Sequence, residues 1–246
     1  MRLLPGKSEN EVKDFWFPGR WIGGISLILA PLVLLTGVLL RMPFHFFFPQ
    51  QLSAFKDHPG LMTASYNFFV AGNILLWPAV VTLATIVGKK RSQLALWGGT
   101  LVVCGLFART FHSGADYLAF QLVRLQGVEQ ATEAVAGSYG AFHIVTVLNG
   151  AILSGWIILA AGAYLAGTFG LVRSIALGLM AALMIGVLKG SSWVSVAAST
   201  GLCAAFLPLG IEVLKSGPAT GYKAILCWSF VVIGVVVVFY FLGQAG

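Results

Sequence analysis

Residues 94–120 read LALWGGTLVVCGLFARTFHSGADYLAF, an apolar run that contains Arg109, His112 and Asp116. At ~1.5 Å of rise per residue, about 20 residues let a helix cross a hydrocarbon core ~30 Å thick, so this run is long enough to span a bilayer. The whole chain is 58% hydrophobic and 9% charged, whereas roughly a quarter of an average soluble domain is charged. The sequence therefore predicts an all-α integral membrane protein, because a helix satisfies its own backbone hydrogen bonds in lipid.

Seven apolar runs of this kind are present, and we expect residues 1–246 to form a single bundle of about seven transmembrane helices. The runs cover roughly residues 21–41, 61–87, 94–120, 139–166, 173–188, 192–214 and 224–243. Only LKGSS separates the fifth run from the sixth, so one kinked or re-entrant element is the alternative, and six spans are the fallback. Residues 42–60 are expected to form an outer aromatic loop and residues 121–138 a second outer loop that includes a short helix.

The basic residues predict the orientation. If residues 1–20 are a retained cytoplasmic segment, ten basic residues lie inside and four outside, which agrees with the positive-inside rule and leaves the C-terminus external. The inner set is Arg2, Lys7, Lys13, Arg20, Lys89, Lys90, Arg91, Arg173, Lys215 and Lys223, and the outer set is Arg41, Lys56, Arg124 and Lys189. The net charge of +7 then indicates attraction to anionic inner-leaflet lipid, not to nucleic acid. We expect the bacterial cytoplasmic (plasma) membrane as the location.

The three ionisable residues of the third run share one helical face, since they are spaced by three and four positions. A charge at the bilayer centre costs about 2.5 to 3.5 kcal/mol, so this face is expected to turn toward the bundle interior. Matching stripes occur in the second and fourth runs: Tyr66, Asn73 and Trp77 in the second, and Tyr139 and His143 in the fourth, with Asn149 at the edge. The spacing places His143 level with His112. We therefore predict a polar pocket between spans two, three and four that opens outward.

The outer loop adds the run PFHFFFP, which Pro43 and Pro49 bracket. Two prolines this close argue against one long continuous helix. The aromatic run either anchors the chain at the membrane interface or folds over the pocket. In the second case His45 and Phe46 contact the ligand.

Three interpretations of the pocket residues stay open. In the first, His112, Asp116 and His143 are catalytic acids and bases, and Arg109 holds an anionic group of the ligand. In the second, the same imidazoles and carboxylate bind zinc, although the neighbouring Arg109 repels a cation, so no metal and no other cofactor is expected. In the third, Arg109 and Asp116 form a buried charge pair that holds helices together.

The function expected from this pattern is binding of a lipid-soluble or amphiphilic small molecule, with acid–base chemistry on a lipid or isoprenoid-like substrate as one outcome. A receptor, an immunity protein or an accessory membrane protein without chemistry is the alternative. A small-solute transporter is less favoured, because the polar residues stop in the outer half of the bundle. The expected partners are the bilayer and this molecule, and the sequence does not specify an oligomeric state or a partner protein.

Two families resemble the chain in general plan. The seven-span arrangement resembles that of membrane hydrolases such as alkaline ceramidases, whose last span carries an H-x-x-x-H pair that residues 224–243 do not contain. The size and aromatic content are similar to those of small integral membrane terpene cyclases, and this similarity implies an isoprenoid-like substrate.

Overall fold

The structure, a computed structural model, describes residues 16–138, 144–217 and 221–245. Every regular element in these ranges is a helix. In chain order the elements are α1 (Arg20–Leu40), α2 (Phe48–Asp57), α3 (Pro59–Gly88), α4 (Ser92–Gln126), α5 (Val128–Ser138), η1 (Ile144–Leu148), α6 (Asn149–Leu165), α7 (Leu171–Gly178), η2 (Leu179–Ala182), α8 (Trp193–Lys215) and α9 (Tyr222–Ala245).

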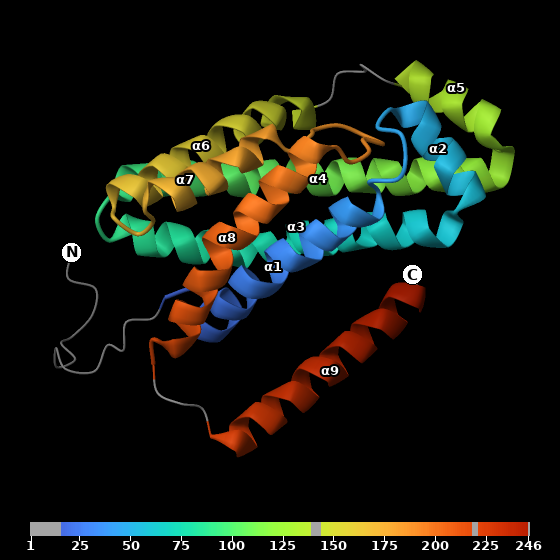
Figure 1. Cartoon of the computed structure of the whole chain (residues 1–246). Helices are drawn as coiled ribbons and strands as arrows, with labels where there is room; N and C mark the ends of the chain where they lie inside the picture. Colours follow the sequence, from blue (N-terminus) through green and yellow to red (C-terminus); the bar gives the residue numbers. More distant parts are fainter. Residues whose placement is uncertain (1–15, 139–143, 218–220, 246) are drawn as a thin grey trace, which may run out of the picture. The chain divides into compact units, whose positions relative to one another are not determined.

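Six described helices are long and apolar enough to cross a membrane, which confirms a helical, multi-pass membrane architecture. They are Arg20–Leu40, Pro59–Gly88, Ser92–Gln126, Ile144–Leu165, Trp193–Lys215 and Leu226–Gln244. The chain forms two compact units, Met1–Leu214 and Lys215–Gly246, and α9 belongs to the second. In the first unit α3 and α4 lie side by side, α1 packs obliquely against α3, and α6 packs against α4 with α7 beside it (Figure 1).

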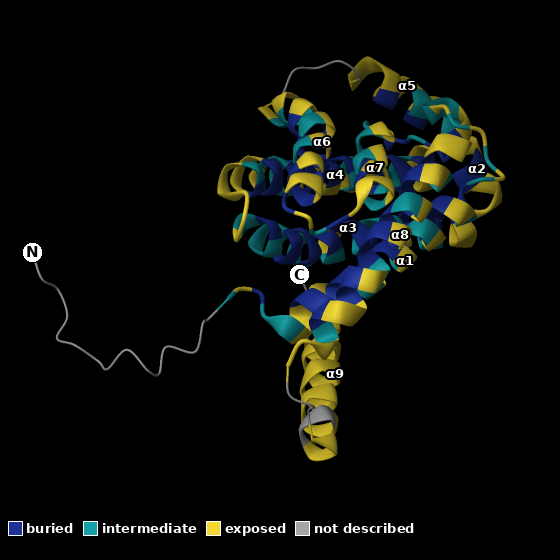
Figure 2. Ribbon diagram, turned by 60° about the vertical axis from the view of Figure 1, so that its left-hand side comes forward, coloured by how far each residue is buried: buried dark blue, intermediate teal, exposed yellow. Residues whose placement is uncertain are grey.

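Close helix contacts hold the first unit together. Gly155 on α6 faces α4 so tightly that a Cβ atom would lie 2.6 Å from the backbone nitrogen of Val102. Small residues at such crossings are typical of helices in lipid, where backbones must approach closely to gain packing energy. Buried residues lie where the helices face one another, and many exposed residues on the outer faces are large and hydrophobic, as expected of lipid-facing surfaces (Figure 2).

A cap of two short helices, α2 and α5, covers one end of the bundle, which we call the α2 end (Figure 1). Helix α4 has 35 residues and therefore measures ~52 Å, well beyond the ~30 Å of a hydrocarbon core. Its last turns pack against the cap in a separate hydrophobic cluster that includes Phe55, Met62, Phe120, Val135 and Leu188. Glu129 and Glu133 are exposed on α5, so the short helix predicted within residues 121–138 is present.

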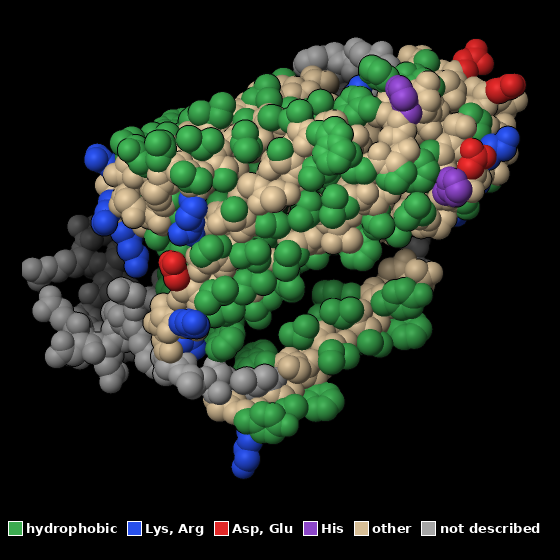
Figure 3. All heavy atoms as spheres, in the orientation of Figure 1, with side chains coloured by type: hydrophobic (Ala, Val, Ile, Leu, Met, Phe, Trp, Pro, Cys, Tyr) green, Lys and Arg blue, Asp and Glu red, His purple; other side chains and the backbone are tan. Residues whose placement is uncertain are grey.

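Charged side chains gather at the two ends of the first unit, and hydrophobic side chains cover its flank (Figure 3). The end opposite to the cap holds the α3–α4 turn with Lys89, Lys90 and Arg91. Arg91 donates to the carbonyl of Leu165 over 3.3 Å, which places the end of α6 beside that turn. We call this side of the bundle the basic end.

The fifth predicted span differs from the structure. A single helix over 173–188 is not formed, because the short apolar helix Leu171–Ala182 ends there and residues 183–192 are non-helical. The local sequence explains the break: Gly186 has φ +122°, which an L side chain rarely adopts, and α8 begins anew after Ser192. Ser192 and Ser195 bond reciprocally to each other's backbone N–H groups at 3.4 and 3.3 Å, which is the geometry of a capping box.

Candidate functional site

The non-helical segment, residues 183–192, passes along α4 toward the α2 end. Its start lies beside Arg109 of α4, and Leu188 lies beside Asp116, two helical turns further along. Gly190 then donates to the Phe46 carbonyl over 2.9 Å, at the α2 end. Helix α8 returns to the opposite side, where Gly210 meets Leu27 of α1. The chain therefore crosses the bundle between residues 171 and 190 as a half-length helix followed by non-helical backbone.

Arg109 holds the first part of this segment. Its Nη1 atom donates to the Met184 carbonyl and its Nη2 atom to the Leu183 carbonyl, each over 2.8 Å. These carbonyls follow the last turn of η2, where a helix leaves acceptors without internal partners. The side chain is only 4% exposed, so both bonds form in a dry environment where an unmade bond is costly. The planar guanidinium suits two neighbouring acceptors at once.

Asp116 holds the second part. One of its carboxylate oxygens accepts the backbone N–H of Leu188, and Asp116 is 7% exposed. Leu188 has φ 52°, a left-handed conformation that costs a branched side chain roughly 1 to 2 kcal/mol. The Leu188 side chain is completely buried, and the Leu188 N–H donates a hydrogen bond to Asp116. Both features stabilise this conformation.

Arg41 holds the third part from the end of α1. Its Nη1 atom donates to the Lys189 carbonyl over 3.2 Å. Its guanidinium carbon lies 4.4 Å from the ring centre of Tyr66 and 4.6 Å from that of Phe69, within cation–π range. The neighbouring residue is a glycine, which lets the non-helical segment lie against Phe46. A Cβ atom at Gly190 would lie 2.8 Å from the Cα of Phe46.

The predicted charge pair between Arg109 and Asp116 is replaced by a different arrangement. Both side chains bind the backbone of the non-helical segment. Non-helical backbone at membrane depth is tolerated where protein groups satisfy it, and the two ionisable residues of α4 supply such groups.

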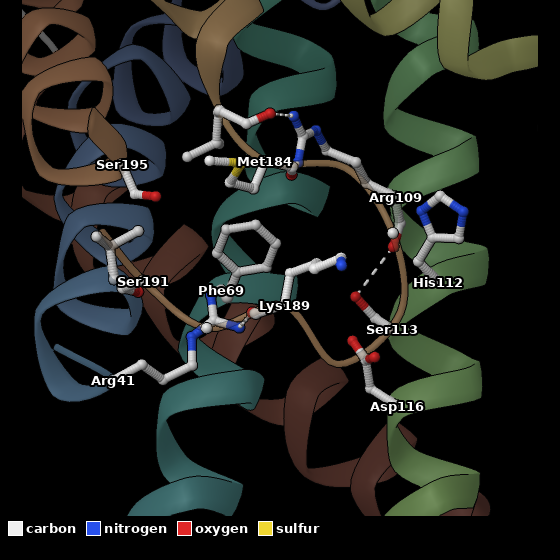
Figure 4. Close-up of a pocket in the computed structure, with 14 residues that line it drawn as sticks. Arg41, Phe69, Arg109, His112, Ser113, Asp116, Met184, Lys189, Ser191 and Ser195 are labelled. Atoms are coloured by element: carbon white, nitrogen blue, oxygen red, sulfur yellow. Dashed lines mark hydrogen bonds between the residues drawn. The ribbon is translucent and has the colours of Figure 1, made fainter. Parts of the chain in front are cut away.

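A small polar cavity lies between α1, α3, α4 and the non-helical segment (Figure 4). Its volume is about 30 Å³. The lining includes Arg41, Phe69, Arg109, His112, Ser113, Asp116, Lys189, Ser191 and Ser195. The structure thus brings Arg109, His112 and Asp116 of the predicted site to one cavity, but with α1 and the non-helical segment as the other walls.

A larger recess, which we call the aromatic pocket, lies between α2, α3 and α4 near the α2 end. It has a volume of about 230 Å³ and is lined by Phe55, Thr63, Tyr66, Asn67, Val70, Ser113, Tyr117, Phe120, Gln121 and Arg124. Phe55 and Phe120 stack with ring centres 4.3 Å apart, and Tyr66 meets Phe120 edge-on at 4.9 Å. Ser113 lines both the cavity and the aromatic pocket.

The other predicted site residues are dispersed. Tyr66 lines the aromatic pocket and donates its hydroxyl to Gln51 over 3.0 Å. Asn73 donates to Phe69 of its own helix, and Trp77 packs edge-on against Phe17. Neither the cavity nor the aromatic pocket has Asn73, Trp77, Asn149, His45 or Phe46 in its described lining. His143 and Tyr139 lie outside the described residues.

Several residues around the cavity were missed by sequence reasoning. In the sequence Arg41 and Lys189 count only as outer charges, and Ser195 is not singled out. Gln51 is fully buried, accepts from Tyr66 and donates to the His45 carbonyl, yet it stood in a presumed loop. The useful signal was the run GVLKGSS, because two glycines and two serines so close together indicate a chain break where long residues can bind backbone.

A metal site would require at least three His, Cys, Asp or Glu side chains close together. The described residues, which do not include His143, contain no such group. The chain matches no known family model, no curated protein and no solved structure. The two recesses are therefore the features that indicate a function.

Proposed function

We propose that this membrane protein binds a single-chain anionic amphiphile, such as a fatty acid or an isoprenoid acid, in the aromatic pocket. The observation that carries the proposal is the pocket's composition: a buried aromatic floor of Phe55, Tyr66 and Phe120 beneath a polar rim. An apolar recess with a few polar groups at its mouth is the usual form of a small-molecule site. At about 30 Å³, the polar cavity is too small for such a ligand.

The pocket's dimensions and charge define the ligand class. Its volume of about 230 Å³ is below the ~300 Å³ at which pockets for drug-sized molecules begin, so it suits part of one slender chain. The guanidinium of Arg124 lies 5.3 Å from the ring centre of Phe55 at the exposed rim, where it attracts an anionic head group. None of the described lining residues is a histidine or a carboxylate, which favours binding over acid–base chemistry.

The proposed orientation places the basic end in the bacterial cytoplasm and the α2 end outside. Seven crossings then include the half-length helix and the non-helical segment as the fifth, with the C-terminus external. In this orientation the aromatic pocket lies at the outer leaflet, which gives an amphiphile direct access from the membrane interface.

The test is photocrosslinking with a diazirine derivative of palmitate on the full chain in liposomes, followed by mapping of the adducts by mass spectrometry. Adducts are expected on residues 63–70 and 113–124. Val70→Trp fills the pocket and should reduce these adducts several-fold. Arg124→Gln should weaken labelling by palmitate but not by the corresponding diazirine alcohol, which has no charge to recognise.

Ile74→Trp is the matched control, because Ile74 is exposed one turn further along α3 and is absent from the pocket lining. Its labelling should equal that of the natural chain. Adducts spread evenly over the exposed helix faces, or equal labelling of Val70→Trp and Ile74→Trp, would overturn the proposal.

A further inference from the structure

The polar cavity carries an excess of positive charge. Arg41 and Arg109 line it, and Asp116 is the only carboxylate in its described lining, so two buried positive charges face one negative charge. Arg41 and Arg109 are each only 4% exposed. Like charges that share a dry site repel one another, and an uncompensated buried charge is strongly unfavourable. The cavity therefore favours an additional negative charge.

Two hydrogen-bond donors of the cavity wall point to where that charge lies. The Nε atom of Arg41 and the Oγ atom of Ser191 are buried and have no hydrogen-bond partner among the described residues. Both side chains line the cavity (Figure 4). Buried polar groups in native proteins nearly always have a partner, so two orphaned donors at one cavity indicate a ligand that accepts hydrogen bonds.

The size of the cavity restricts this ligand. A volume of about 30 Å³ holds two or three water-sized particles, because a single water needs roughly 10 to 15 Å³ of such space. A phosphoryl or carboxylate head group with its attached chain does not fit. A monatomic halide is only slightly larger than water and accepts several hydrogen bonds at once. Water satisfies the donors equally well but leaves the positive charge uncompensated.

We propose that the cavity is a chloride site, in which Arg41 Nε and Ser191 Oγ donate to the ion, and Arg109 and Lys189 supply the surrounding positive charge. This site is independent of the amphiphile proposed for the aromatic pocket. Bound chloride neutralises part of the charge beside the non-helical segment and so stabilises the fifth crossing. Because only the folded chain has this cavity, chloride raises the stability of the fold by mass action.

The test measures the melting temperature of the full chain in detergent while chloride replaces gluconate at constant ionic strength. The melting temperature should rise and saturate with chloride. Ser191→Ala removes one donor to a charged acceptor and should raise the chloride concentration at half-effect by about tenfold. Crystals grown in bromide should show an anomalous peak beside Arg41 and Ser191.

Ser174→Ala is the matched control. The hydroxyl of Ser174 is also buried without a partner among the described residues, but Ser174 lies on α7 and is absent from the cavity lining. Its chloride titration should match that of the natural chain. Three results would overturn the proposal. They are a melting temperature that does not change with chloride, an equal loss of the chloride response in both serine variants, and electron density for water without an anomalous bromide peak.

Discussion

Arg109 and Asp116 lie on one face of α4, and each binds main-chain atoms of the same neighbouring segment. Each residue binds backbone groups that have no partner within their own segment. Arg109 satisfies two carbonyls beyond a helix end, and Asp116 satisfies the N–H of a leucine in a left-handed conformation. Their charges matter because bonds to charged groups contribute about 1.5 to 3 kcal/mol, against about 1 kcal/mol for neutral ones.

Asp116→Ala should lower the free energy of unfolding by at least about 1 to 3 kcal/mol, because the buried N–H of Leu188 loses its only described acceptor. The measurement is thermal unfolding of the purified chain in detergent. Glu133→Ala serves as the comparison, since Glu133 is exposed on α5 and its removal should change stability by less than about 0.5 kcal/mol. Identical melting temperatures would show that Asp116 contributes nothing through Leu188.

At this scale, the sequence predicted which face of the third run is buried but not what that face contacts. Arg109, His112 and Asp116 share a stripe by helical geometry, and all three are buried. The partners of Arg109 and Asp116 are backbone atoms more than 70 positions away, and backbone atoms have no identity that a sequence pattern can show. Arg41 was misjudged for a similar reason, because a cation at the end of an apolar run looks the same whether it faces solvent or aromatic rings.

Residues 171–192 form the part of this fold that departs most from a simple bundle. Its helical part, Leu171–Ala182, is shorter than the ~20 residues that a spanning helix needs. Arg41, Arg109 and Asp116 bind the backbone of the non-helical segment that follows. The order of this segment therefore depends on side chains of other helices, whereas α4 and α6 satisfy their own backbone groups.

Arg109→Lys should loosen the non-helical segment without disturbing the rest of the first unit. A single ammonium group cannot reproduce the planar fork that reaches two carbonyls, and loss of one such bond corresponds to about a tenfold change in an opening equilibrium. Hydrogen exchange followed by mass spectrometry should show faster exchange over residues 183–190 and unchanged exchange in α6. Arg124→Lys should leave both regions unchanged, and faster exchange spread over all helices would contradict a local role.

The spans with uninterrupted apolar periodicity could be predicted from the sequence to within a few residues, as α1, α3 and α8 illustrate. The fifth could not, since composition alone does not distinguish a continuous helix from a helix followed by buried non-helical chain. The prediction of an aromatic loop over residues 42–60 was also incomplete. Residues 48–57 form α2, and Phe55 of this helix lines the aromatic pocket. A short helix of mixed polarity needs a partner surface, and that surface comes from α3 and α4.

On the scale of the whole molecule, the number of crossings determines the side on which the chain ends. Cysteine labelling tests this number. The starting variant lacks the native Cys104, Cys203 and Cys227, and it receives one cysteine at a time, at Lys90, at Glu133, at Thr168 or after Gly246. In intact cells an impermeant maleimide should label Glu133→Cys and the appended cysteine only. A protected C-terminus would mean that the fifth segment does not cross, and labelling at Lys90→Cys would mean that the whole orientation is reversed.

The separation between Arg109 and its acceptors also has a consequence for biosynthesis. The Leu183 carbonyl lies 74 positions after Arg109, so a ribosome adding about 5 to 20 residues per second makes it roughly 4 to 15 s later. During that interval the arginine is already inside a membrane-length helix and lacks the acceptors that it has in the finished fold. We therefore expect newly made α4 to stay in an aqueous or protein-lined compartment until residues 183 and 184 have been made.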